Sequence, residues 1–184
     1  YGDLLKSVFF ANEIPCFVDA KRALIKSRVA ACVDAALAVL AGGWRTGDVL
    51  RYVKAGYADL TEDEESLIVR LTREKGLRGY DFKKRFYFED EAAEAAREKA
   101  VQPLVKLEQD AREEGMAEAL LRFANTVRLM QKTLDFAARL EEEGWYAEAS
   151  FHAQAAEKAM EILREAKTAA GGGLTAGEWR ALLK

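Results

Sequence analysis

The sequence is poor in the residues that most often carry chemistry. Its 184 residues include one histidine, His152, and two cysteines. A catalytic zinc site usually needs three protein ligands, and the sequence shows no such cluster at metal-ligand spacing. It also lacks a glycine-rich phosphate-binding loop. Because acid–base and nucleophilic catalysis need converging groups, we predict a protein that is not an enzyme and that uses no metal and no cofactor.

The two cysteines, Cys16 and Cys32, fall in one predicted helical region. A rise of about 1.5 Å per residue separates them by roughly 24 Å along a helix, which excludes a disulfide within it. Reduced, buried cysteines are typical of a reducing compartment, so we expect a cytoplasmic location. The longest apolar run, Ala30–Leu40, is interrupted by Asp34 and is too short to cross a bilayer. Because the chain begins at Tyr1 rather than Met, we expect that residues precede it.

Proline and side-chain amides are also scarce, whereas hydrophobic residues make up 50% and charged residues 32% of the chain. Few amides among many charges is a pattern seen in thermophile proteins, although a GC-rich genome encoding a helical protein explains it equally well. The composition is that of a globular protein with a sizeable core. The net charge of −3 excludes a molecule that is a polycation as a whole, so any nucleic-acid surface must be local.

Apolar residues recur at spacings of three and four along most of the chain, which predicts a mainly α-helical protein. Thr61 and Glu64 form a capping box at the start of one helix. Pro103 is expected to separate two helices, and Gly144 to end a long one that begins after Gly115. The second half is expected to form antiparallel helical hairpins. In the first half we expect helices near residues 3–12, 15–41, 46–56 and 61–76.

Residues 79–88 are aromatic and basic, and Tyr80 and Phe82 alternate with polar residues. This pattern predicts a β-hairpin that turns near Lys83 and Lys84. Three short helices followed by a basic hairpin are the order of a winged helix-turn-helix, which residues 33–88 resemble. The resemblance implies a regulator that lays one helix and the hairpin, or wing, on nucleic acid.

Seven basic and two acidic residues lie between Arg70 and Phe88, and clustered cations attract phosphates. The resemblance puts two of the basic residues on a recognition helix and three at the wing tip. Residues 62–65 depart from the pattern, because they put four carboxylates where a major-groove helix meets the bases. An ordinary solvated surface or a protein-contacting winged helix is the alternative. The candidate nucleic-acid contacts are Arg70, Arg73, Arg78, Lys83, Lys84 and Arg85.

Residues 144–160 resemble a hallmark segment of the HEPN family, helical proteins that include many RNases. The shared pattern is Gly, Tyr and Ala, then Phe-His-Ala-Gln and Ala-Ala-Glu-Lys-Ala. The match needs a one-residue gap, and the catalytic Arg-x(4–6)-His of that family is absent because positions 145–147 hold Trp, Tyr and Ala. A tetratricopeptide-type hairpin shares the pattern. His152, four residues after Glu148, fits a carboxylate-bonded histidine better than a metal ligand.

The distribution of charged residues and the three glycines at 171–173 indicate where the chain divides into domains. Residues 1–88 hold 15 Lys and Arg against 12 Asp and Glu, whereas residues 89–184 hold 13 against 19. We predict a helical, winged-helix-like domain at 1–88, a helical bundle at 89–170 and a glycine-linked amphipathic tail at 171–184. The tail either docks into a groove on a partner, with Trp179, Leu182 and Leu183 as anchors, or folds back on its own domain.

The sequence thus favours a mainly α protein with a small β-hairpin in its first half. The leading interpretation is a non-catalytic nucleic-acid-binding or regulatory protein that contacts phosphates through residues 70–88. Its C-terminal helices form a homodimer or hold a protein partner. The alternative is a protein-interaction adaptor or scaffold subunit that binds its partner through those helices and the tail.

Overall fold

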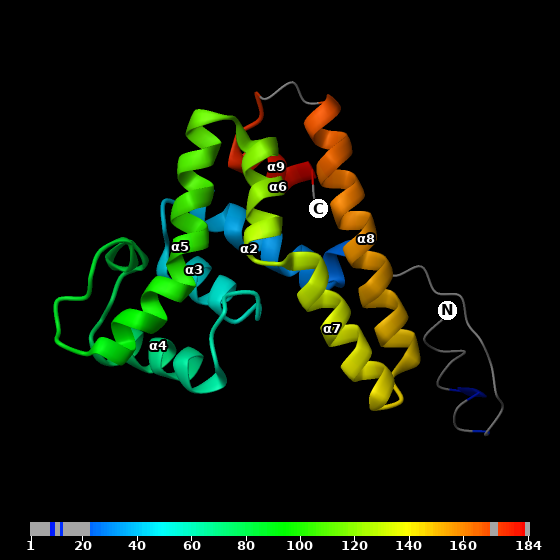
Figure 1. Ribbon diagram of the computed structural model, residues 1–184, viewed down its shortest axis with the longest axis horizontal. Helices are drawn as coiled ribbons and strands as arrows, with labels where there is room; N and C mark the ends of the chain where they lie inside the picture. The colour runs from blue at the N-terminus through cyan, green and yellow to red at the C-terminus, as the bar shows by residue number, and fades with distance from the viewer. Residues whose placement is uncertain (1–7, 10–11, 13–22, 170–172, 183–184) are drawn as a thin grey trace.

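The computed structural model describes residues 8–9, 12, 23–169 and 173–182, and every regular element in those ranges is helical (Figure 1). The prediction of a mainly α protein is confirmed. Most of the helix expected at 3–12, together with Cys16, lies outside the described residues. The longer elements are η1 (Leu24–Lys26), α2 (Arg28–Ala41), α3 (Thr46–Val53), α4 (Glu62–Glu74), η2 (Gly79–Lys83), α5 (Glu91–Glu113), α6 (Met116–Thr126), α7 (Leu129–Glu142), α8 (Tyr146–Ala169) and α9 (Ala176–Leu182).

Helix α2 lies at the centre of the core and contacts α3, α5, α7, α8 and α9. It has its own N-terminal cap, because Ser27 is extended and its hydroxyl accepts a hydrogen bond from the Ala30 amide at 3.2 Å. The helix expected at 15–41 is confirmed for Arg28–Ala41, but it does not run continuously through its described part, because Ser27 starts a new helix by satisfying an otherwise unpaired amide. Complete burial raises the pKa of the Cys32 thiol in α2, which keeps that thiol protonated and unreactive.

Two helical hairpins pack beside α2, one formed by α5 and α6 and the other by α7 and α8 (Figure 1). The long helix expected between residues 115 and 144 is interrupted, because Arg128 adopts a left-handed conformation with φ of 51°. The exposed Arg128 side chain lies 3.0 Å from Asp59, and the neighbouring Val127 is buried. The sequence pattern does not indicate this break, because the apolar residues of α6 and α7 continue at the same helical spacing.

Pro103 does not separate two helices, contrary to the prediction. It lies inside α5, which continues through it. A proline inside a helix costs about 3 kcal/mol, because it removes one backbone hydrogen bond and crowds the preceding turn. Val101, Leu104 and Leu107 are all buried in the core. Burying each such side chain contributes about 1.5–3 kcal/mol, which offsets the cost of the proline.

The predicted β-hairpin is wrong. Gly79–Lys83 forms the 3-10 helix η2, and residues 84–90 contain no strand. The alternation of aromatic and polar residues misleads, because Phe82 and Phe86 both point into the core and their rings meet edge to face at 5.4 Å. The carboxylate of Asp81 accepts a hydrogen bond from the Arg78 amide at 2.8 Å and so closes the turn. Without a hairpin wing, the described residues do not form a winged helix.

Glu94 and Arg97 of α5 fasten η2 to the rest of the fold. Arg97 donates to the Phe82 carbonyl at 2.8 Å and to the Glu94 carboxylate at 2.5 Å. The same carboxylate accepts a hydrogen bond from the Phe86 amide at 3.1 Å. The hydrogen bonds from Arg97 hold the pKa of Glu94 below its ordinary value. Glu94 therefore stabilises the fold in its ionised form.

We expect acid to weaken this fastening. The lowered pKa means that the contribution of Glu94 is complete above the unfolded-state pKa of about 4.5 and is lost as pH falls through the lower folded-state pKa. Glu94→Gln should therefore lower the free energy of unfolding by about 2 kcal/mol at pH 7. The gap between the two proteins should be smaller at a pH well below 4.5 than at pH 7. Urea unfolding at both pH values measures it, and an equal gap at both would refute the ionised role.

Candidate functional site

Five of the six predicted phosphate contacts are exposed. Arg70 and Arg73 lie on α4, whereas Arg78, Lys84 and Arg85 flank η2. None of these five forms an ion pair with another residue that the structure describes. Their positively charged groups are therefore free to meet an anion, although α4 and η2 do not form the helix and wing of a winged helix. Their role as nucleic-acid contacts stays a prediction.

Lys83, the sixth, has a structural partner. Its ammonium group lies 2.6 Å from the Glu108 carboxylate of α5 and 5.0 Å from the centre of the Trp44 ring. Burial disfavours the charged form of Glu108, but the neighbouring Lys83 and Arg112 outweigh it and lower the pKa of that carboxyl. The Trp44 indole also donates to Glu108 at 3.3 Å. Lys83 thus joins η2 to α5 and is not available to phosphate.

The aromatic residues of the same segment divide into two sets. Phe82 and Phe86 are core residues, and Phe88 stacks on Phe86 at 5.0 Å. Tyr80 and Tyr87 are exposed, and the Tyr80 ring lies 5.4 Å from the Lys84 ammonium group. Most aromatic residues of this segment therefore pack in the core rather than face solvent.

The tail helix α9 packs against α2 of its own chain. Trp179 is only 2% exposed, and the Arg180 guanidinium donates to the Asp34 carboxylate at 2.7 Å. Asp34 also pairs with Arg51 of α3 at 3.1 Å, so one carboxylate joins three helices. This is the fold-back arrangement of the tail. Partner binding through Trp179 would require α9 to leave α2, and Leu183 and the side chain of Leu182 lie outside the described residues.

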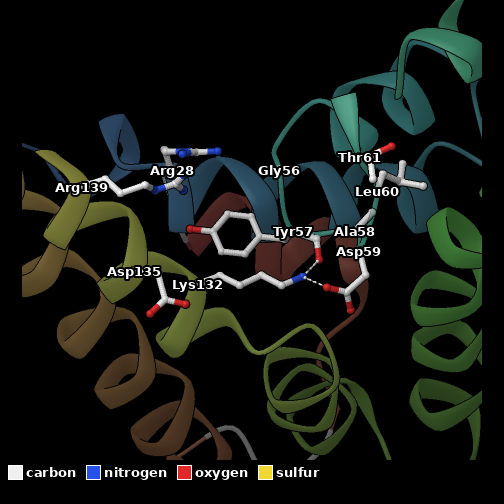
Figure 2. Close-up of a pocket in the computed structure, with 10 residues that line it drawn as sticks. All are labelled: Arg28, Gly56, Tyr57, Ala58, Asp59, Leu60, Thr61, Lys132, Asp135 and Arg139. Atoms are coloured by element: carbon white, nitrogen blue, oxygen red, sulfur yellow. Dashed lines mark hydrogen bonds and ion pairs between the residues drawn. The ribbon is translucent and has the colours of Figure 1, made fainter. Parts of the chain in front are cut away.

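A pocket of about 390 Å³ opens between α2, α7 and the loop that joins α3 to α4. Figure 2 shows Arg28 and Arg139 toward one end and Lys132 with Asp59 toward the other. The wall between them carries Tyr57, whose hydroxyl lies 2.7 Å from the Thr133 hydroxyl. The lining residues are Arg28, Gly56, Tyr57, Ala58, Asp59, Leu60, Thr61, Lys132, Asp135 and Arg139.

The Lys132 end of the pocket is electrostatically satisfied. Its ammonium group lies 2.8 Å from the Asp59 carboxylate and donates to the Tyr57 carbonyl at 2.7 Å. Hydrogen bonds from Lys132 and Arg128 hold the pKa of Asp59 below its ordinary value. This end therefore fixes the loop between α3 and α4 against α7.

The other end of the pocket holds Arg28 and Arg139, with the Asp135 carboxylate toward the same side (Figure 2). The guanidinium carbons of Arg28 and Arg139 lie 4.1 and 5.9 Å from the centre of the Phe136 ring. Neither arginine pairs with a carboxylate among the residues that the structure describes. Sequence reasoning missed both, because Arg28 is separated from α7 by about a hundred residues. The only available signal was the spacing of Lys132, Phe136 and Arg139 on one helix face.

Metal-binding clusters and membrane-spanning helices are not found among the described residues. Within those ranges, no three His, Cys, Asp or Glu side chains are grouped so that they could hold a metal ion. Among the helices of the same part of the chain, none combines the length and the apolar character needed to cross a membrane.

No protein-family model matches this sequence. Several curated proteins resemble it, and each is named as a subunit of an ATP-dependent helicase/deoxyribonuclease. The protein of Clostridium botulinum strain Loch Maree is 25% identical across 94% of this chain, and that of Alkaliphilus oremlandii is 25% identical across 89%. The protein of Clostridium kluyveri is 30% identical across 60%. These matches cover 17%, 16% and 11% of the relatives, so the chain spans about a sixth of their length or less.

These relatives correct the predicted function. The leading interpretation, a non-catalytic nucleic-acid-binding or regulatory protein, is wrong, because the relatives are named as subunits of a helicase and nuclease. The prediction that the protein is not an enzyme is contradicted for the same reason. A segment of a large enzyme can lack that enzyme's catalytic groups, so their absence from 184 residues was weak evidence. The alternative of a scaffold subunit with a protein partner agrees better with what this chain resembles.

Proposed function

We propose that this chain is a helical part of a subunit of an ATP-dependent helicase/deoxyribonuclease. The observation that carries the proposal is the extent of the resemblance, because the alignment with the Clostridium botulinum relative covers 94% of the chain rather than one motif. A match of that extent covers α2 and both helical hairpins. The chain then acts on DNA as one element of a larger assembly, with a companion subunit as its protein partner.

The tip of the α7–α8 hairpin is the surface best suited to that partner. Trp145 and Tyr146 lie next to each other at this turn and are 57% and 69% exposed. Tryptophan and tyrosine are the residues that most often dominate binding energy at protein interfaces. We therefore assign contact with the companion subunit to this tip.

Replacing Trp145 and Tyr146 together with alanine should weaken binding of the companion subunit at least tenfold, because interface aromatics commonly contribute more than about 1 kcal/mol each. Surface plasmon resonance with the immobilised companion measures this. The control is Tyr80→Ala with Tyr87→Ala, which removes two aromatic residues that are 54% and 75% exposed near η2. Equal affinity of both double variants would overturn the assignment of the tip.

DNA contact within this assembly is proposed for the exposed basic residues near α4 and η2. Arg70 and Arg73 of α4 are exposed and form no ion pair with any residue in the described ranges, whereas Lys83 is left out because it pairs with Glu108. Arg70→Gln with Arg73→Gln should lower affinity for duplex DNA and reduce its salt dependence, since each phosphate contact releases counterions. Fluorescence anisotropy at two salt concentrations tests this, and unchanged affinity would contradict it.

A further inference from the structure

We infer that the Arg28–Arg139 end of the α2–α7 pocket binds a phosphate of the DNA backbone. The identification of the ligand as DNA rests on the proposed function. The identification of the bound group as a phosphate rests on the residues that line the pocket. The pocket is separate from α4 and η2, which carry the basic residues that the sequence displays.

The first argument is the unpaired charge. Arg28 and Arg139 approach the same Phe136 ring, with guanidinium carbons 4.1 and 5.9 Å from its centre. Two like charges that share one ring repel each other, and no described carboxylate forms an ion pair with either. A doubly coordinated anion between them would relieve that repulsion. Guanidinium groups match phosphate oxygens well, because their N–H donors form a planar fork.

The second argument is that the structure holds Arg28 in place before any ligand arrives. Its guanidinium lies against the Phe136 ring and donates to the Ala55 carbonyl at 3.5 Å. Gly56 makes room for it, since a Cβ atom at this position would lie 2.4 Å from the Arg28 Nη2 atom. Gly56 also has a φ of 79°, which disfavours other residues. A prepositioned arginine loses less conformational entropy on binding than a free one.

The third argument is the arrangement of the positively charged residues along the pocket. Arg128 directly precedes α7, and Lys132 and Arg139 lie seven residues apart on one face of α7, or roughly 10 Å at 1.5 Å per residue. Asp59 neutralises part of this charge at Arg128 and Lys132, and Asp135 is engaged by the Gln131 amide at 2.8 Å. A neutral amide does not cancel the charge of a carboxylate, so the pocket lining holds three cations, Arg28, Lys132 and Arg139, against two carboxylates, Asp59 and Asp135. The excess positive charge lies with Arg28 and Arg139, which form no ion pair among the described residues. A row of cations that ends in two arginines without described ion-pair partners suits the successive phosphates of a DNA backbone better than it suits a single carboxylate.

The test compares three double variants that each remove two positive charges. Arg28→Gln with Arg139→Gln alters the pocket, and Arg70→Gln with Arg73→Gln alters α4. Lys106→Gln with Arg164→Gln changes two exposed cations on α5 and α8 that lie in neither surface. The probe is a fluorescent twelve-residue oligothymidine, measured by anisotropy over a range of salt concentrations. Circular dichroism verifies that each variant is folded.

We expect the pocket variant to bind the oligonucleotide about tenfold more weakly than the control variant. The slope of the logarithm of the binding constant against the logarithm of the salt concentration should also fall in magnitude by about one to two, as loss of one or two phosphate contacts does. Arg139→Gln alone should show part of the same loss. The Arg139 side chain is exposed, and its guanidinium forms no hydrogen bond among the described residues, so this replacement disturbs the fold less than the double variant. Pocket and control variants of equal affinity would overturn the inference and leave the proposed function standing. Failure of the companion subunit to bind would overturn the proposed function instead.

A second arm distinguishes backbone phosphate from a free anion. Titration of ¹⁵N-labelled protein with pyrophosphate, followed at the arginine Nε–Hε resonances, reports whether a small anion binds the pair. Shifts with pyrophosphate but no loss of oligonucleotide affinity in the pocket variant would contradict the DNA assignment. Shifts at the same two arginines with the oligonucleotide support it.

Discussion

Trp179→Ala is expected to lower the free energy of unfolding by about 3–5 kcal/mol, the usual cost of removing a buried tryptophan from a core. Its indole is among the largest fully buried side chains of the described structure, although it lies only a few residues from the end of the chain. Helix α9 has seven residues and is too short to be stable alone. Loss of the indole should therefore release α9 from α2 and expose the apolar surface beneath it.

Urea unfolding followed by circular dichroism measures this effect without relying on tryptophan fluorescence. Trp145→Ala is the matched control, because it removes the same side chain from an exposed position and should change stability by about 0.5 kcal/mol or less. If both substitutions had the same small effect, α9 would not be part of the fold. The tail would then be available to a partner, as one interpretation of the sequence holds.

Gly79→Ala is expected to destabilise the protein by about 3 kcal/mol, at the upper end of the usual cost of overpacking. A Cβ atom at this position would lie 2.4 Å from the Trp44 carbonyl oxygen and 2.8 Å from the Thr46 nitrogen. These are backbone atoms, so they cannot rotate away as a side chain can. The Gly79 amide also donates to the Thr46 hydroxyl at 2.9 Å, and separation of the two segments would break that bond.

Gly47→Ala serves as the control for this substitution. Gly47 lies in α3, and a Cβ atom there would meet no other atom within 4 Å. Alanine in a helix is favoured over glycine by about 0.5–1 kcal/mol, so this change should be neutral or stabilising. Thermal unfolding of the two variants should therefore show shifts of opposite direction or very different size. Equal shifts would mean that η2 does not pack closely against the start of α3.

The sequence predicts elements well where a local signal decides the structure. The capping box at Thr61 and Glu64 is present, with the Thr61 amide 2.9 Å from the Glu64 carboxylate. The helix end at Gly144 is correct as well, since this glycine has a φ of 85°. Both features depend on residues within four positions of each other. Their energies are fixed by the local chain, so no knowledge of the rest of the fold is needed.

The errors arise where distant contacts override local patterns. The aromatic residues of 79–88 resemble a strand, yet Arg97 and Glu94 hold this segment as a 3-10 turn from another part of the chain. Pro103 looks like a helix end, but burial of its neighbours in α5 keeps the helix continuous. The arginine pair at Phe136 is formed by residues far apart in sequence, so spacing alone could not reveal it.

The functional error has a different origin. Composition and motifs describe only the residues present, whereas this chain matches about a sixth of the length of its relatives. Catalytic groups elsewhere in such a protein leave no trace in this segment. The predicted protein partner agrees with relatives that are named as subunits, and it came from the apolar helices of the second half rather than from any motif.

The most direct test of the proposed function is ATP-dependent degradation of linear duplex DNA by the full-length protein that carries this chain, assembled with its companion subunit. The account predicts a stable complex that unwinds and degrades the duplex only when ATP is present, with rates well above those of the companion alone. Failure of the two proteins to associate, or a complex no more active than the companion alone, would contradict it.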